Sequence, residues 1–196
     1  MEVLLETDRL ILRRFTGADL DDLVDLNSDA EVMRYLTGGT PIPRIEVEEK
    51  ILPRFLWYYD AFPAFGFYAA VEKETSAFIG WFHLRPDPDD GRPDTPELGY
   101  RLRRGAWGHG YATEGAVALI AKAFEELGAT RVYAETMAIN FRSRRVMEKA
   151  GLRFVRDFRG TYPQEIPGDE SGQVEYAVTR EEWEQDRRRQ AAPGER

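Results

Sequence analysis

The residues from 107 to 114 combine small side chains with a position that favours anion binding. They read Trp107-Gly108-His109-Gly110-Tyr111-Ala112-Thr113-Glu114 and lie between a predicted strand and a long predicted helix. Successive backbone N–H groups at a helix N-terminus attract negative charge, and glycine lets a phosphate approach without a Cβ in the way. We therefore expect this loop to bind a diphosphate.

Two common nucleotide-binding loops fit these residues poorly. The phosphate loop of nucleoside triphosphatases ends in Gly-Lys-Ser/Thr, which is missing here. A dinucleotide-binding glycine motif opens a parallel strand-helix-strand unit, whereas this loop lies in the middle of the chain. A nucleotide-binding enzyme is therefore disfavoured, while a plain structural turn before a helix stays open on the spacing alone.

Hydrophobic periodicity predicts the elements that position the loop. Residues 97–102 form the strand that leads into it, and the helix that follows ends at Gly128. The apolar face of that helix consists of Ala112, Ala116, Leu119, Ile120, Ala123, Phe124 and Leu127. Later in the chain, a helix over 141–150 is flanked by the last strands, at 131–137, 153–159 and 174–178.

The first half of the chain alternates between strand and helix signals. A first strand is predicted over 4–15, one broken helix over 19–36 and a second helix over 45–59. The ranges 65–72 and 77–85 are typical of an antiparallel hairpin, and the proline- and aspartate-rich range 86–94 of a loop. These elements indicate a mixed α/β domain around a largely antiparallel sheet.

Composition and charge limit the classes of protein and partner. The chain has 196 residues, 42% hydrophobic and 32% charged, as in an ordinary globular domain. We expect a single domain over 1–185 and a polar C-terminal tail over 186–196. The net charge of -8 opposes general binding to nucleic acid and suits a cationic substrate.

Residue types exclude several kinds of chemistry. The chain has no cysteine, so a cysteine nucleophile and a thiolate metal site are excluded. The two histidines, His83 and His109, lie far apart in the sequence, and we expect no metal. No signal peptide and no apolar run of membrane-spanning length are evident, so we expect a cytoplasmic protein that does not bind membranes.

Two segments together resemble the GNAT acetyltransferase superfamily. Its pyrophosphate loop reads Gln/Arg-x-x-Gly-x-Gly/Ala between a strand and a helix, and residues 107–112 match it with Trp107 at the first position. Residues 140–152 resemble the superfamily's Asn-x-x-Ser/Ala…Glu-Lys-x-Gly-Phe segment, with Leu152 in place of phenylalanine. Two segments in the right order are far more specific than either alone.

The resemblance extends over nearly the whole chain and is strongest to the branch of ribosomal-protein N-terminal acetyltransferases. The segments that carry it are Thr7-Asp8-Arg9-Leu10, Glu97-Leu98-Gly99-Tyr100, and Glu175-Tyr176-Ala177 with Trp183. It implies an α/β (α+β) GNAT fold, a mixed and mostly antiparallel seven-stranded sheet that splays in the middle and is flanked by helices, with acetyl-coenzyme A (acetyl-CoA) in the splay. The implied acceptor is a ribosomal-protein N-terminus or a small-molecule amine, and the chain is expected to be a monomer or a homodimer.

Acetylation of an amine needs a base, an oxyanion partner and a proton donor for the departing thiolate. The resemblance assigns the base to Glu97, since a glutamate at this strand position serves as base in related acetyltransferases. A solvated strand end remains the alternative for Glu97, and His83 is the rival base because imidazole titrates near neutrality. Many superfamily members protonate the thiolate with a tyrosine where this chain has Met147. Ser143, on the same helix face as Asn140, is our candidate donor.

The expected catalytic residues are thus Glu97 and Ser143. The residues expected to bind acetyl-CoA are Tyr100, Leu102, Gly108, His109, Gly110, Tyr111, Ala112, Thr113, Asn140 and Arg144. Asn140 is also a preferred helix N-cap, and a helix-surface role stays open for both Ser143 and Arg144. The predicted function is an N-acetyltransferase that works by direct attack in a ternary complex. The alternative is a non-catalytic acyl-CoA-binding sensor or interaction module, which Met147 favours.

Overall fold

The structure, a computed structural model, describes residues 2–87, 92–160 and 166–191. Within these residues eight strands form one sheet in the order β1-β2-β3-β4-β5-β6-β8-β7. The strands are β1 (Val3–Glu6), β2 (Leu10–Arg14), β3 (Gly66–Glu72), β4 (Phe78–Arg85), β5 (Glu97–Leu102), β6 (Arg131–Met137), β7 (Arg153–Phe158) and β8 (Gln173–Thr179). Only β5 and β6 pair in parallel among these strands. The mixed, mostly antiparallel fold class is confirmed, with eight strands in the described residues instead of seven.

The additional strand comes from the N-terminus. Residues 4–15, expected as a single strand, form the hairpin of β1 and β2, with a turn at residues 7–9. Thr7 closes this turn, since its N–H donates to the Leu10 carbonyl at 2.9 Å and its Oγ1 accepts from the Leu10 N–H at 2.9 Å. The sequence pattern is compatible with one continuous strand. It therefore gave no sign that the chain reverses there.

Helices cover both faces of the sheet. They are α1 (Leu20–Ser28), α2 (Ala30–Thr37), α3 (Arg44–Glu46), α4 (Leu52–Ala61), α5 (Tyr111–Glu125), α6 (Phe141–Lys149) and α7 (Arg180–Ala191). Shorter turns are η1 (Gly17–Asp19), the π-helical η2 (Val47–Ile51), η3 (Arg104–Ala106) and η4 (Asp169–Ser171). The expected break in the first helix lies at Asp29, whose carboxylate caps α2 by accepting from the Glu31 N–H at 2.9 Å.

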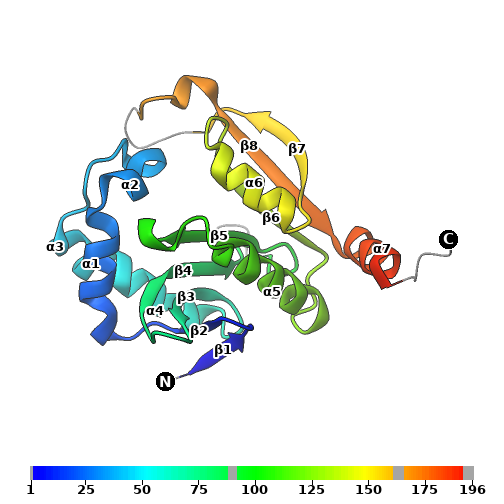
Figure 1. Cartoon of the computed structure of the whole chain (residues 1–196), viewed down its shortest axis with the longest axis horizontal. Coiled ribbons are helices and arrows are strands. Elements are labelled where there is room, and N and C mark those ends of the chain that lie inside the picture. The colour runs from blue at the N-terminus through cyan, green and yellow to red at the C-terminus, as the bar shows by residue number, and fades with distance from the viewer. Residues whose placement is uncertain (1, 88–91, 161–165, 192–196) are drawn as a thin grey trace.

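Two hydrophobic cores lie on opposite faces of the sheet. One contains Leu98 of β5 and Leu119 of α5, and the other contains Leu23 of α1, Phe55 of α4 and Trp81 of β4. In Figure 1, β8 runs at a steep angle to β4 and β5, and α5 and α6 lie near the place where the two parts of the sheet meet. The fold therefore places two helix N-termini beside the junction of β5 and β6.

Two expected segments extend beyond the described residues. Residues 88–91 of the predicted loop over 86–94 lie outside them, as do residues 192–196 of the predicted tail. Residues 186–191 of that tail belong to α7. In the described part of the chain, no helix has both the length and the apolar character needed to span a bilayer, and no group of three or more metal-ligating side chains occurs.

Candidate active site

The sheet opens between β5 and β6. Their ladder is confined to the pair Glu97 and Tyr133, supported by a hydrogen bond of 3.2 Å from the Tyr133 N–H to the Pro96 carbonyl. Beyond this pair both strands continue, to Leu102 and Met137, without further ladder partners between them in the described residues. Parallel strands that separate at their carboxyl ends leave backbone groups for a ligand, as at switch points of open α/β sheets.

The backbone of β5 presents alternate residues to this opening. The Arg103 N–H donates to Ile79 of β4 at 2.9 Å, and the Pro96 carbonyl accepts from β6, so odd-numbered residues face β4 and even-numbered residues face β6. The backbone groups of Tyr100 and Leu102 therefore point toward β6, past the last ladder pair. The Leu102 carbonyl accepts from the Trp107 Nε1 at 2.9 Å, so the Leu102 N–H and the backbone groups of Tyr100 are the ones left for a ligand such as the predicted acetyl-CoA.

The loop at the end of β5 presents the uncapped N-terminus of α5. Gly108 and Gly110 adopt left-handed conformations, with φ of 81° and 85°, and Gly110 is the N-cap residue without a side-chain cap. The Glu114 N–H donates to the Gly110 carbonyl at 3.0 Å, so the N–H groups before it lack intrahelical partners. Tyr111, Ala112 and Thr113 form this first turn, and together with the preceding glycines they make up the predicted anion cradle.

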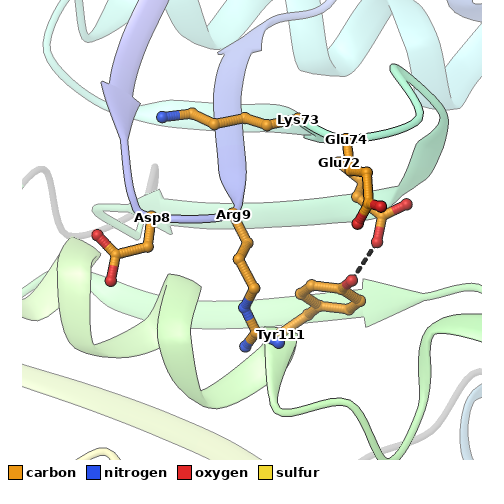
Figure 2. A pocket seen from close by; sticks show the side chains of 6 residues that line it. All are labelled: Asp8, Arg9, Glu72, Lys73, Glu74 and Tyr111. Carbon is orange, nitrogen blue, oxygen red and sulfur yellow. Dashed lines mark hydrogen bonds between the residues drawn. The ribbon is translucent and has the colours of Figure 1, made fainter.

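Contacts from the first hairpin hold the loop from outside. The Arg9 Nη1 donates to the His109 carbonyl at 3.0 Å, and Nε donates to Glu114 at 2.7 Å. The guanidinium also lies over the Tyr111 ring, 4.6 Å from its centroid. Figure 2 shows Arg9 and Tyr111 in the wall of a surface cavity of about 360 Å³, with the Tyr111 hydroxyl donating to Glu72. The Tyr111 side chain thus lies on the outer side of the loop. Its backbone N–H remains part of the predicted cradle.

The N-terminus of α6 faces the same opening. The Asn140 side chain caps this helix by accepting from the Ser143 N–H at 3.3 Å, and its amide donates to Thr136 of β6 at 3.0 Å. The Tyr100 hydroxyl lies 3.0 Å from both the hydroxyl and the carbonyl oxygen of Ser143. This contact brings together a residue predicted to bind cofactor and the predicted proton donor.

Two arginines of α6 differ in their surroundings. Arg144 donates from Nη1 to the Ala138 carbonyl at 2.9 Å and from Nε to the Tyr176 hydroxyl at 3.1 Å, so its side chain ties α6 to β8. Arg142, by contrast, lies over the Trp107 ring of the loop, 5.3 Å from the centroid. Arg142 is therefore the cation of α6 that contacts the loop, whereas Arg144 was the one predicted to reach a phosphate.

Glu97 occupies the closed end of the opening, where the strands still pair. Its carboxylate accepts from Arg85 of β4, and its Oε1 lies 3.7 Å from the Nε2 of His83. Arg85 in turn donates to the Tyr58 hydroxyl of α4 at 3.1 Å. Gly99 makes room for the imidazole, because a Cβ there would lie 2.5 Å from the His83 ring. The two rival bases are thus direct neighbours.

Burial and charge set the protonation of this pair. Burial alone would raise the pKa of Glu97, but His83 and Arg85 lower it to about 2. Burial lowers the pKa of His83 below its ordinary value, and the neighbouring carboxylate of Glu97 only partly offsets this. At neutral pH the site therefore holds an ionised glutamate beside a neutral imidazole.

The predicted residues gather around one opening, with the cradle and the α6 N-cap at its wide end and Glu97 at its closed end. Sequence reasoning assigned no role to Arg9 or Arg142. Arg9 lies in the quoted motif of residues 7–10, and Arg142 lies within the Asn140 segment beside the N-cap, so both were visible in the motifs. Arg9 and Arg142 contact residues that are distant in sequence. The spacing of residues along one element does not predict such contacts.

Comparisons with known proteins agree with this geometry. The family model described as an acetyltransferase (GNAT) domain matches residues 9–153. The FsC-acetyl coenzyme A-N(2)-transacetylase of Aspergillus fumigatus is 36% identical over 187 residues, which cover 91% of this chain and 77% of the relative. The crystal structure of an acetyltransferase from Agrobacterium tumefaciens is 26% identical, with a TM-score of 0.70 over 89% of this chain and 92% of that chain.

A ribosomal L7/L12 alpha-N-protein acetyltransferase, solved in complex with coenzyme A, shares the fold at 16% identity. Its TM-score is 0.74, over 91% of this chain and 98% of that chain. The family match covers most of the chain and its named relatives are acetyltransferases, which favours an enzyme over a sensor. The chain is an acyltransferase and belongs to the GNAT acetyltransferase family.

Proposed function

We propose that the protein transfers the acetyl group of acetyl-CoA to a primary amine by direct attack within a ternary complex. The observation that carries the proposal is the uncapped N-terminus of α5 at the wide end of the β5–β6 opening, with Glu97 at the closed end. A cradle for a pyrophosphate and a carboxylate for an amine, placed at the two ends of one opening, suit a long thioester substrate whose reactive end lies near Glu97.

The residues of the chain suit a reaction without an acyl-enzyme intermediate. The amine nitrogen forms a bond to the thioester carbon, the carbon–sulfur bond breaks, and the nitrogen loses a proton. Glu97, ionised and adjacent to His83, accepts that proton directly or through water. The departing thiolate takes a proton from the hydroxyl pair of Ser143 and Tyr100, which regains one from solvent as Glu97 releases the proton that it accepted. The chain has no cysteine to carry the acetyl group between two half-reactions.

The acceptor is an amine of a small molecule or of a protein N-terminus. The Aspergillus relative is named for transfer to a nitrogen, N(2), of FsC, and the ribosomal-protein acetyltransferase for transfer to a protein α-amine. The first of these shares 36% identity with this chain, whereas the second shares the fold alone, so the acceptor of the first is the better guide.

Release of coenzyme A with a panel of amines tests the proposal. Since the chain has no cysteine, a thiol reagent detects released coenzyme A without background from the protein. The panel contains diamines, amino acids, aminoglycosides and peptides with free N-termini. Initial rates against both substrates should give intersecting reciprocal plots, as direct transfer requires. Parallel plots would indicate an acyl-enzyme, and no amine-dependent release would contradict the proposed function.

A further inference from the structure

Arg101 differs from the other arginines on its face of the sheet. Arg13 pairs with Asp19 at 2.5 Å, Arg85 with Glu97, and Arg103 with Asp22 at 2.9 Å. Arg101, in the middle of β5, has no carboxylate partner among the described residues. Burial lowers the pKa of its guanidinium to about 10, with no acidic group offsetting the shift. A largely desolvated cation without a counter-ion is costly, and its presence calls for an explanation.

The side chains around Arg101 offer one acceptor and two further donors. Its Nη1 donates to the Oδ1 of Asn27 on α1, and its guanidinium lies 5.1 Å from the centroid of the Trp81 ring on β4. The Nε of Arg101, the Nδ2 of Asn27 and the Nε1 of Trp81 are buried donor atoms without a partner in the described structure. The Nε atoms of Arg13, Arg85 and Arg103 also lack a partner, so Arg101 differs from them in having no carboxylate and in lying beside two further unpaired donors.

Such a cluster has a defined chemical complement. Buried polar groups are almost always hydrogen-bonded, and each one left unpaired costs free energy. A group that accepts several hydrogen bonds and carries negative charge would complement these donors, which describes an oxyanion such as a carboxylate. Arg101 retains intermediate exposure, whereas Asn27 is fully buried, so the guanidinium is the accessible side of the cluster.

The position of the cluster connects it to the reaction. Trp81 and Arg101 are cross-strand partners, and Glu97 lies on the same face of β5, four residues earlier. Residues i and i+4 of a strand are separated by about 13 Å between their Cα atoms. Because the side chain of Arg101 is long, the distance between its guanidinium and the Glu97 carboxylate can be shorter than the distance between the two Cα atoms. The buried His83 ring covers Gly99 between the two residues. A molecule with its amine at Glu97 therefore passes the His83 ring and reaches Arg101 with a group several bonds away.

We propose that Arg101, Trp81 and Asn27 form a subsite for a carboxylate of the acceptor. The acceptor is then an amino-carboxylate, a molecule with both an amine and an acid group, rather than a simple amine. This inference rests on the acetyl transfer proposed above and adds the substrate class. Glu97 attracts the amine, and the uncompensated charge of Arg101 orients the molecule by its opposite end.

Matched pairs of acceptors test the subsite. The probes are ω-amino acids of four to eight carbons, such as 6-aminohexanoate, each compared with the alkylamine of equal length, such as hexylamine. In the wild-type enzyme the value of kcat/KM for the best amino acid should exceed that for its alkylamine by about tenfold or more, through a lower KM. Arg101→Gln should abolish this preference while leaving the alkylamine rate and the KM for acetyl-CoA unchanged.

Two further variants separate recognition from folding. Arg103→Gln removes a neighbouring arginine that already has carboxylate partners, and it should keep the preference. Trp81→Phe keeps an aromatic ring under Arg101 but removes one donor, and it should weaken the preference in part. A purely structural role for Arg101 predicts equal losses for both members of each acceptor pair. No preference in the wild type, or a preference retained in Arg101→Gln, would overturn the subsite.

The outcome is distinguishable from a failure of the proposed function. Amines acetylated without preference for a carboxylate would leave the acetyltransferase proposal intact and overturn the subsite. If no amine is acetylated, the subsite can still be tested by calorimetric titration of 6-aminohexanoate and of hexylamine into enzyme saturated with coenzyme A. Tighter binding of 6-aminohexanoate, lost in Arg101→Gln, supports the subsite without turnover, and equal binding of both probes overturns it.

Discussion

Arg9 and Glu114 connect the first hairpin to the cofactor loop across 105 positions of sequence. Glu114 accepts from the Arg9 side chain at 2.7 Å and from its backbone N–H at 3.0 Å, while Arg9 also donates to the His109 carbonyl at 3.0 Å. Burial alone would raise the pKa of Glu114, but hydrogen bonds from Thr7 and Arg9 lower it, so the carboxylate stays ionised. The pair therefore fixes the loop before the cofactor arrives.

Replacing Arg9 should weaken cofactor binding without slowing chemistry. In Arg9→Met the loop loses its outer support and has to be ordered by the cofactor, so the KM for acetyl-CoA should rise about tenfold with kcat nearly unchanged. Steady-state kinetics at saturating amine measure both constants. Lys73→Met is the matched control, because Lys73 lines the same surface cavity but its ammonium contacts Glu6 and the Thr7 carbonyl rather than the loop over 107–114. Equal effects of both variants would show that Arg9 does not act on the loop.

Gly110→Val should abolish most binding of acetyl-CoA in a folded protein. The φ of 85° at Gly110 is strained for any residue with a Cβ, by about 1–2 kcal/mol, and the branched side chain would cover the backbone donors. Calorimetry should show affinity reduced by at least about tenfold, with circular dichroism unchanged. Gly105→Ala is the control, since a Cβ there meets open space at an ordinary φ. Unchanged affinity in folded Gly110→Val would exclude this loop as the cradle.

The local parts of the site could be predicted from the sequence. The glycines of the loop and Asn140 as N-cap follow from rules that act within a few residues, and the structure has both. Gly128 likewise adopts the left-handed φ of 72° expected after a helix. The amphipathic pattern of α5 also predicted its buried face, because this face depends only on the spacing of apolar residues within one helix.

Contacts between elements could not be predicted in this way. The approach of Ser143 to Tyr100 depends on how α6 docks against β5, and the link from Arg9 to Glu114 depends on where the first hairpin lies. Neither contact follows from hydrophobic periodicity. This periodicity predicts which face of an element is buried, but not which other element packs against it. That no carboxylate of the described residues pairs with Arg101 is likewise a property of three elements together.

Asp19→Asn should destabilise the protein at neutral pH. Burial by itself raises the pKa of Asp19, but hydrogen bonds from Arg13 and Thr16 lower it below its ordinary value. A carboxyl with a depressed folded-state pKa contributes stability above its unfolded-state pKa, and the contribution is lost as the pH falls through the folded-state pKa. Removing the charge leaves Arg13 buried and unpaired, at a cost of about 3 kcal/mol.

Urea unfolding from pH 7 downward measures this effect. The difference between wild type and Asp19→Asn should be full at pH 7 and should narrow as the pH falls below about 4. Asp25→Asn is the control, because its ion pair with Arg103 is largely exposed and should be worth at most about 1 kcal/mol. A pH-independent difference would show that the charge of Asp19 does not cause the stabilisation.

The hydroxyls of Ser143 and Tyr100 should contribute to departure of the thiolate. Ser143→Ala and Tyr100→Phe each remove one member of the pair, and each should lower kcat by about tenfold with the KM for the amine unchanged. The double variant should lose little more than the worse single variant, because the two groups act as one donor. Thr113→Val, which removes a hydroxyl from the predicted cradle, is the control and should not lower kcat in this way. Fully additive losses would show that the two hydroxyls work independently.

Glu97→Gln should lower kcat by about a hundred- to ten-thousand-fold and leave acetyl-CoA binding nearly intact. The wild-type carboxylate, with a pKa of about 2, stays ionised throughout the range from pH 5 to 9, so its own titration produces no acid limb there. The fall of kcat/KM at acid pH should instead follow protonation of the acceptor amine. Raising the pH should partly rescue Glu97→Gln, because more of the amine is then already neutral.

His83→Asn distinguishes the two neighbours at the closed end. If Glu97 is the base, this variant should lose much less activity than Glu97→Gln, because the neutral imidazole lies beside the carboxylate without carrying the proton. Glu48→Gln, which removes an exposed carboxyl of η2, is the control for a general change in charge. Near-wild-type kcat of Glu97→Gln across the pH range, together with a large loss in His83→Asn, would assign the base to His83. That result would also give the wild-type profile an acid limb below pH 6.5, since burial lowers the pKa of this imidazole from its ordinary value.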